Sequence, residues 1–270
     1  MVGATTNDDL GNYQELQPPF TDADVTHRVF WTGDGPPVLV MHELPGLTPA
    51  ALRFGRRLAA RGFRAYLPLL FGEPEQDDWR GGYRALCISR EFANLKAGVS
   101  APIVDWLRAL VRDLSARHQH ANVGAIGMCL TGAFVIPLIL ERCVTAPVAA
   151  QPGAPFSMMF RIIGIGRGPW MTQLNVSDTD LEKAAARAER DNLTLLAGRF
   201  EKDRICPAAR LDRLQTVFGA RFVRREFSGG SFLNPPHATL TTGYEQAPDD
   251  PRDPMHTWFE DVVAFLKDRL

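Results

Sequence analysis

Long apolar runs are missing from this 270-residue sequence, and their absence argues against a membrane protein. No run approaches the roughly 18 consecutive apolar residues that a membrane-spanning helix needs. The first 20 residues are polar and partly acidic, without the charged-then-apolar layout of a secretory signal. We therefore expect a protein with no membrane segment and a cytoplasmic location.

The sequence also contains few cysteines and has almost no net charge. The 4 cysteines are widely and irregularly spaced and form no CxxC pair, which argues against both a disulfide framework and a zinc knuckle. The formal net charge of −1 provides no basic surface for nucleic acid or an anionic membrane. We expect no metal site and no nucleic-acid partner, and the sequence does not indicate an oligomeric state.

Segments typical of buried strands alternate with segments typical of helices along most of the chain. This alternation predicts an α/β fold in which a mostly parallel central sheet is flanked by helices on both faces. Strands are expected at 25–31, 36–43, 63–72, 122–128, 146–153, 193–198 and 221–227, and helices at 48–62, from 100 onward, and at 130–143, 177–190, 207–218 and 255–270. In such sheets, functional sites form at the carboxyl ends of the strands.

The domain organisation predicted from composition is simple. A polar arm at 1–24 should precede one domain at 25–270. Within this domain, 153–176 is rich in Gly, Pro, Met and aromatic residues, and we expect it to be a lid or an insertion. The segment either shapes a pocket or covers a sheet edge.

The segment AIGMCLTGAF, residues 125–134, places Cys129 between a predicted strand and a predicted helix. A nucleophile elbow has this form, in which Gly127 and Gly132 would let the strand and the helix approach closely. The amide of Leu130 would then face the oxyanion of a tetrahedral intermediate. The alternative is that Cys129 is a buried core residue beside a tight turn.

A cysteine nucleophile needs a base, and the base needs an orienting acid. In hydrolases with this elbow, the chain order is nucleophile, acid, base. Asp203 and His237 each follow a predicted strand and fit that order, whereas Asp212 and His256, their nearest rivals, fall at predicted helices.

Glu43 follows the apolar segment VLVM and should lie near the top of the sheet, partly out of water. A carboxylate there is costly unless it is paired, hydrogen-bonded or protonated. Glu43 either forms a structural hydrogen bond or contacts the thiol and controls its protonation. The following amide, that of Leu44, lies in the loop that normally supplies the second oxyanion donor.

These residues together resemble the dienelactone hydrolase family of α/β-hydrolases. The resemblance rests on H-E-L-P-G-L (42–47), G-M-C-L-T-G (127–132), D-R-I-C-P (203–207) and the late His237. It implies the α/β-hydrolase fold and a triad of Cys129, His237 and Asp203. It also implies that Glu43 holds the resting thiol and releases it when substrate enters, that the Leu44 and Leu130 amides form the oxyanion hole, and that no cofactor is needed.

The sequence departs from the family pattern at two positions, and it is longer than the family archetype, mainly at the N-terminus and around residues 152–180. Thr131 stands where the elbow usually has glycine, and Thr241 stands where the family archetype has a carboxylate-binding arginine. Arg90 is a candidate for a second such arginine, with a surface salt bridge as the alternative. The natural substrate therefore stays open among small esters, lactones and thioesters.

The sequence predicts a cysteine-dependent hydrolase of a small carboxylic ester or lactone that forms an acyl-thioester intermediate. Two other functions are open: a catalytically silent α/β-hydrolase-fold protein that binds a ligand, and a thiol redox sensor. A redox sensor usually has a resolving cysteine nearby, and Cys206 lies close to Asp203 in the sequence.

Overall fold

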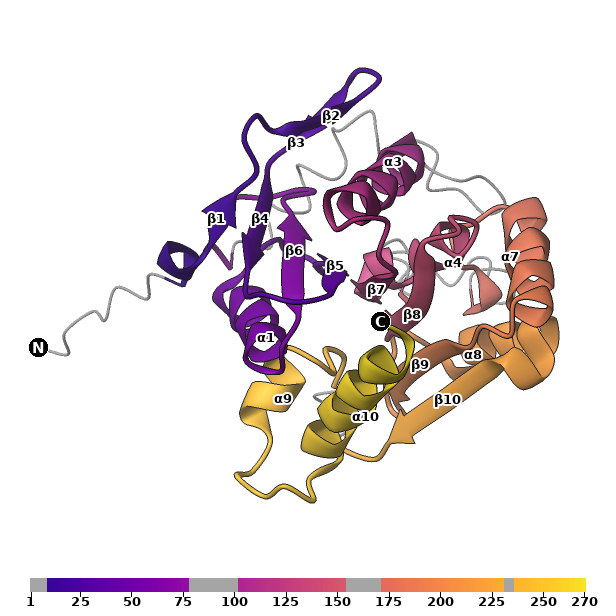
Figure 1. The fold of residues 1–270 in the computed structure, drawn as a ribbon. Coiled ribbons are helices and arrows are strands. Elements are labelled where there is room, and N and C mark those ends of the chain that lie inside the picture. The colour runs from indigo at the N-terminus through magenta and orange to yellow at the C-terminus, as the bar shows by residue number, and fades with distance from the viewer. Residues whose placement is uncertain (1–8, 78–101, 154–170, 231–235) are drawn as a thin grey trace, which may run out of the picture.

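A computed structural model describes residues 9–77, 102–153, 171–230 and 236–270 of the chain. Its centre is an eight-stranded sheet in the order β1-β4-β6-β5-β7-β8-β9-β10 (Figure 1). The six strands from β6 to β10 are parallel, and β1 and β4 extend the sheet with antiparallel pairing. The strands, in chain order, are β1 (Gln14–Glu15), β4 (Val29–Thr32), β5 (Pro37–Met41), β6 (Arg64–Pro68), β7 (Val123–Met128), β8 (Val144–Ala150), β9 (Leu195–Phe200) and β10 (Phe222–Phe227).

Helices cover both faces of this sheet (Figure 1). One face carries α1 (Pro49–Ala60) and α10 (Pro254–Arg269), with the short α9 (Thr242–Gln246) beside them. The other face carries α3 (Pro102–Arg117), α4 (Val135–Leu138), α7 (Asp178–Arg190) and α8 (Ala208–Phe218). Each face has its own cluster of buried apolar side chains, so the sheet is buried between two cores. The predicted α/β fold is confirmed.

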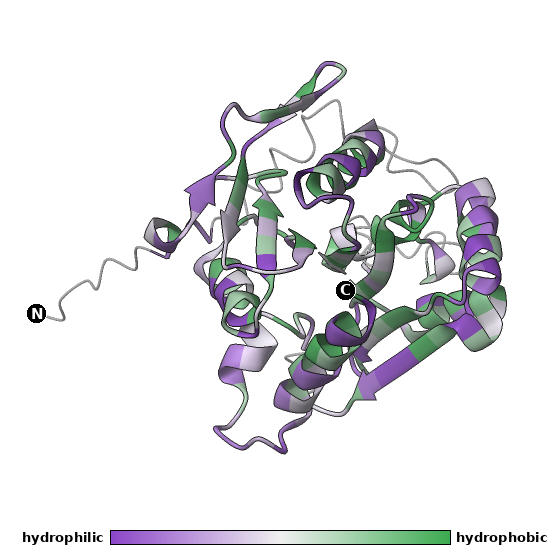
Figure 2. Cartoon of the chain, in the orientation of Figure 1, coloured by the Kyte–Doolittle hydropathy of each residue, from purple (hydrophilic) through white to green (hydrophobic). Residues whose placement is uncertain are grey.

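The central strands are apolar because neither of their faces meets water. Every residue of β5, β7 and β9 is buried. Figure 2 shows these strands mostly in green, whereas the outer helix α7 is largely purple. The predicted catalytic residues follow the carboxyl ends of sheet strands: Cys129 follows β7, Asp203 follows β9 and His237 follows β10.

The described residues of the polar N-terminal arm, from residue 9 onward, contact the domain that follows them. Strand β1 pairs with β4, and the Tyr13 hydroxyl donates a hydrogen bond of 2.5 Å to the carbonyl oxygen of Leu52 on α1. The predicted strand at 25–31 is divided, because β3 (Val25–His27) forms a hairpin with β2 (Phe20–Asp22) while β4 joins the main sheet. Strand β1 could not be predicted from the sequence, because its two residues are polar and show no apolar pattern.

The predicted helix at 130–143 is wrong over most of its length. A 3-10 turn at Cys129–Gly132 and the four-residue α4 replace it, and the chain then turns toward β8. Pro137 lies inside α4 and has no amide hydrogen to extend a helical ladder. Almost all of this segment is buried, so its continuous apolar character reflects core packing and not helical periodicity.

Candidate active site

Cys129 lies at a sharp turn directly after β7. Its φ angle is +54°, a left-handed conformation that costs energy for a residue with a side chain. A Cβ atom on Gly127 would lie 2.2 Å from the carbonyl oxygen of Thr131, and one on Gly132 would lie 2.9 Å from the Cα of Pro152. Both glycines are therefore required for the close approach that the sequence predicted. The turn has the geometry of a nucleophile elbow.

Thr131 fastens this turn to the neighbouring strand. Its hydroxyl oxygen accepts a hydrogen bond of 2.9 Å from the Met128 amide, and it lies 2.9 Å from the carbonyl oxygen of Met41 and 3.1 Å from that of His42. The side chain is fully buried. A glycine at position 131 would remove the hydroxyl and its contacts with Met128, Met41 and His42. Threonine in place of the usual glycine therefore connects the Cys129 turn to the backbone just before Glu43.

Asp203 and His237 meet although 34 residues separate them in the sequence. Asp203 follows β9, and its Oδ1 accepts hydrogen bonds from the amides of Ile205 at 2.8 Å and Cys206 at 2.9 Å. Its Oδ2 lies 2.7 Å from Nδ1 of His237. The Asp203 side chain is fully buried and that of His237 is 16% exposed. Two backbone amides thus fix the carboxylate that orients the imidazole.

The second imidazole nitrogen of His237, Nε2, is buried and, within the described part of the chain, has no hydrogen-bond partner apart from its interaction with the Cys129 thiol. Burial lowers the pKa of His237, but the charges of Cys129 and Asp203 and the hydrogen bond to Asp203 raise it by more, so the pKa lies well above its usual value. The imidazole is therefore suited to accept a proton.

The rival acid and base lie in other surroundings. Asp212 pairs with Arg224 at 2.6 Å, and its side chain is 62% exposed. The His256 ring lies on α10, where Nδ1 is 3.0 Å from the carbonyl oxygen of Asp250. Neither residue lines the cavity that holds Cys129 and His237.

Glu43 is held by neutral hydrogen-bond donors. Its Oε1 accepts a short hydrogen bond from the Thr241 hydroxyl, and its Oε2 accepts one of 3.2 Å from Nε2 of Gln151. No hydrogen bond joins Glu43 to Cys129 among the described residues. Burial raises the pKa of Glu43, against the charge of His237 and the two hydrogen bonds, which lower it. The sequence did not single out Gln151, because nothing near residue 151 marks it as a neighbour of Glu43.

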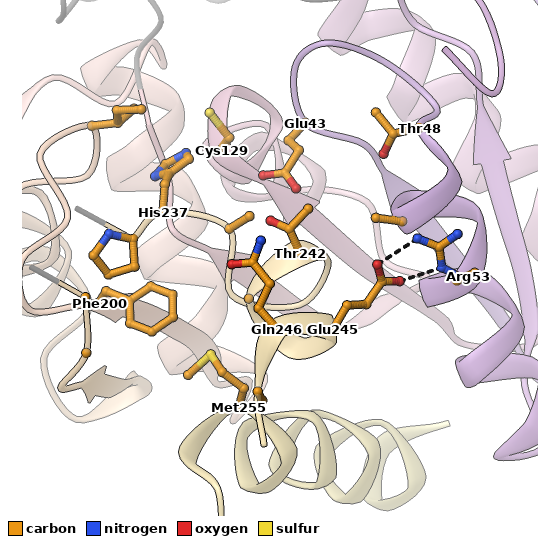
Figure 3. Close-up of a pocket in the computed structure, with 18 of the residues that line it drawn as sticks. Glu43, Thr48, Arg53, Cys129, Phe200, His237, Thr242, Glu245, Gln246 and Met255 are labelled. Atoms are coloured by element: carbon orange, nitrogen blue, oxygen red, sulfur yellow. Dashed lines mark hydrogen bonds and ion pairs between the residues drawn. The ribbon is translucent and has the colours of Figure 1, made fainter. Parts of the chain in front are cut away.

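Cys129, His237 and Glu43 line one cavity of about 760 Å³. Figure 3 shows the three side chains at one end of it, with Phe200 and Met255 toward the other. Leu44, predicted to supply an oxyanion donor, is also in the lining, and Leu130 follows Cys129 in the buried turn. The sulfur is therefore next to open space although Cys129 is only 4% exposed.

At the side of this cavity, an ion pair joins α1 to α9. Both guanidinium nitrogens Nε and Nη2 of Arg53 donate to the Glu245 carboxylate at 2.7 Å, as the dashed lines in Figure 3 mark. Arg53 also pairs with Asp9 at 2.9 Å. Its positive charge thus faces two carboxylates, of which Asp9 also pairs with Arg56 and Glu245 with Arg57.

His42 is a buried histidine beside the site whose contacts require a neutral ring. Its Nδ1 lies 3.0 Å from the Glu43 carbonyl oxygen, and its Nε2 accepts a hydrogen bond of 3.0 Å from the amide of Leu70. Burial lowers the pKa of His42 to about 4. The ring therefore supports the backbone of the Glu43 loop in its uncharged form.

This lowered pKa predicts acid sensitivity. Below about pH 6.5 the unfolded chain binds a proton at His42 that the folded chain does not, so folded stability falls as the pH drops from about 6.5 to about 4. Wild type should be more stable to urea than His42→Gln at about pH 7.5, and the difference should shrink by about 2–3 kcal/mol at about pH 4.5. A difference that does not change with pH would contradict this assignment.

Two predicted features lie outside the described residues: Arg90, and most of the 153–176 segment. Among the described residues, no group of three or more His, Cys, Asp or Glu side chains is arranged to hold a metal ion. The same part of the chain contains no helix long and apolar enough to cross a membrane.

The strand order and the turn at Cys129 define an α/β-hydrolase fold, and solved structures share it. An esterase from Pyrococcus furiosus has a TM-score of 0.63 at 13% identity, covering 100% of this chain and 98% of that one. A protein from Klebsiella pneumoniae, provisionally described as a dienelactone hydrolase, has a TM-score of 0.59 at 16% identity, covering 94% and 98%. A monoacylglycerol lipase from Paleococcus ferrophilus has a TM-score of 0.52 at 16% identity, covering 88% and 99%.

The family is identified by sequence, since likenesses at such low identity establish only the fold. The family model for dienelactone hydrolases matches residues 28–266. The chain belongs to the dienelactone hydrolase family and is a carboxylic ester hydrolase. A search of curated proteins finds no match.

Proposed function

We propose that this protein hydrolyses a small carboxylic ester or lactone through an acyl-thioester on Cys129. The observation that carries the proposal is the ordered pair of Asp203 and His237, with Nε2 of His237 buried, free of other partners within the described residues, and facing the cavity that Cys129 lines. A base oriented by a buried carboxylate and placed beside a thiol is the arrangement that nucleophilic acyl transfer requires.

In the proposed first step, Nε2 of His237 takes the proton from the thiol while Sγ attacks the ester carbonyl carbon. The amides of Leu44 and Leu130 hold the oxyanion of the tetrahedral intermediate. As the carbonyl re-forms, the bond to the alkoxide breaks, and the alkoxide takes the proton from Nε2. In the second step, water gives a proton to Nε2 and its oxygen attacks the thioester. Collapse of the second intermediate expels the Cys129 sulfur, which recovers the proton, and releases the acid.

The redox-sensor alternative has weaker support. The side chain of Cys206 is fully buried, and burial raises the pKa of its thiol, with the nearby Asp203 charge acting in the same direction. A thiol that resists ionisation is a poor resolving partner for an oxidised Cys129. The catalytic function requires only Cys129 and His237, which line the cavity, and Asp203, which contacts His237.

Trapping the acyl-enzyme tests the proposal. A nitrophenyl ester with a slowly hydrolysed acyl group should release a burst of nitrophenol equal to the enzyme concentration. Intact-protein mass spectrometry should then show one added acyl group, and peptide mapping should locate it on Cys129. Labelling of a different residue, or turnover without any labelled species when the protein is quenched during the burst, would contradict the thioester intermediate. Arg90, the candidate for binding a substrate carboxylate, lies outside the described residues. The substrate panel should therefore include lactones with and without a carboxylate.

A further inference from the structure

One glutamine links three segments that the mechanism needs. Gln151 follows β8 directly and is fully buried. Its Nε2 donates to Glu43 at 3.2 Å, and its Oε1 accepts from both the amide of Thr239 at 3.2 Å and the hydroxyl of Thr239 at 2.6 Å. A backbone amide can only donate, so the Thr239 amide fixes the orientation of the Gln151 side chain, with Oε1 toward Thr239 and Nε2 toward Glu43.

Gln151 and Glu43 contact the loop that carries His237 at two residues, Thr239 and Thr241. Thr239 is two residues after His237, and its hydroxyl also accepts a hydrogen bond of 3.2 Å from the indole nitrogen of Trp258 on α10. Thr241 is four residues after His237 and donates to Glu43. The chain segment that follows the imidazole is thereby fastened to the ends of two central strands and to one helix.

The backbone at Gln151 is held in an unusual conformation. Its φ angle is +36°, which is strained for any residue with a Cβ, and its amide donates a hydrogen bond of 2.6 Å to the carbonyl oxygen of Gly198 on β9. Strain of this kind persists when the surrounding contacts over-determine it. Here the side-chain amide uses its oxygen and its nitrogen to bridge a buried carboxyl group and the base-bearing loop, with each atom matched to a suitable partner.

We propose that Gln151 is a positioning residue for catalysis: it sets the place of His237 relative to Cys129, and it keeps Glu43 directed away from the thiol. This inference rests on the proposed function. In this arrangement, Glu43 and Gln151 hold the loop that carries His237 through hydrogen bonds with neutral partners. Nε2 of His237 is then the group that exchanges protons with the Cys129 sulfur.

The test replaces the amide with a side chain of similar shape, Gln151→Met, and measures both turnover and the pH dependence of Cys129 alkylation by iodoacetamide. Loss of the bridge should lower kcat by about 10²-fold with KM little changed, because the base is displaced while the cavity stays open. The alkylation profile should move from that of wild type toward that of His237→Ala.

The matched control is Thr145→Val, which removes one side-chain hydrogen bond of 3.1 Å at the opposite end of the same strand. This control should keep the wild-type kcat and alkylation profile. If Gln151→Met does not fold, Thr239→Val removes the hydroxyl that bonds Gln151 and should shift both readouts in the same direction.

Two results would count against different claims. Reduced thermal stability of Gln151→Met with wild-type kcat and alkylation profile would overturn the positioning role and leave the proposed function intact. Identical turnover and alkylation profiles for wild type and His237→Ala would overturn the proposed function itself.

Discussion

The Cys129→Ala variant should lose at least about 10⁴-fold in kcat/KM toward a short-chain nitrophenyl ester, because the proposed acyl intermediate forms on the sulfur that this substitution removes. Alanine retains a Cβ atom, so the strained turn with φ of +54° is unchanged and the fold should persist. The measurement is initial-rate kinetics together with urea unfolding of both proteins.

Cys143→Ala provides the matched control for this experiment. Cys143 lies near the start of β8, where its thiol is 3.6 Å from the carbonyl oxygen of Val111, and it does not line the cavity. The same chemical change at this remote position should leave kcat/KM at the wild-type value. Equal rates for wild type and Cys129→Ala would refute the nucleophile assignment.

Asp203→Asn should have the second largest effect, a loss of about 10⁴-fold in kcat. The asparagine oxygen can still accept hydrogen bonds from the amides of Ile205 and Cys206. Its nitrogen, however, would then face Nδ1 of His237 and donate to it. That contact favours the tautomer with hydrogen on Nε2, so the imidazole cannot take the thiol proton.

The same substitution should change the pH profile. The Asp203 charge and hydrogen bond both raise the pKa of His237, so removing them should move the acid limb of kcat/KM to lower pH. Asp212→Asn, which neutralises an exposed carboxylate paired with Arg224, is the control and should keep the wild-type profile. A variant at Asp203 with an unshifted acid limb would show that the carboxylate does not act on the base.

The alternation of strands and helices could be predicted from the sequence because parallel strands buried on both faces are continuous apolar runs. The positions of Cys129, Asp203 and His237 followed from the rule that sites form where such strands end. The structure brings the Asp203 and His237 side chains into contact and places Cys129 on the same cavity. Chain order and strand ends thus predicted three positions that lie together in the structure, and their catalytic roles are part of the proposed function.

Other features depend on contacts between distant segments and left no local pattern. Gln151 is polar, but only the fold brings it to Glu43, 108 residues away, and to Thr239, 88 residues away. Thr131 could be seen as a departure from the family pattern, yet its bonding partners at Met41 and His42 could not. The helix predicted at 130–143 failed because an almost entirely buried segment shows no amphipathic periodicity.

The contacts of the N-terminal residues with α1 extend to Arg53, one of the residues that line the cavity. Asp9 forms ion pairs with Arg53 and with Arg56, and the amide of Leu10 donates to Glu75. Proteolytic trimming that removed Asp9 would leave Arg53 with Glu245, which Arg57 also contacts, and would make the electrostatic potential on this side of the cavity more positive. The charge balance of the Arg53 side of the cavity therefore depends on a residue that precedes the first strand of the sheet.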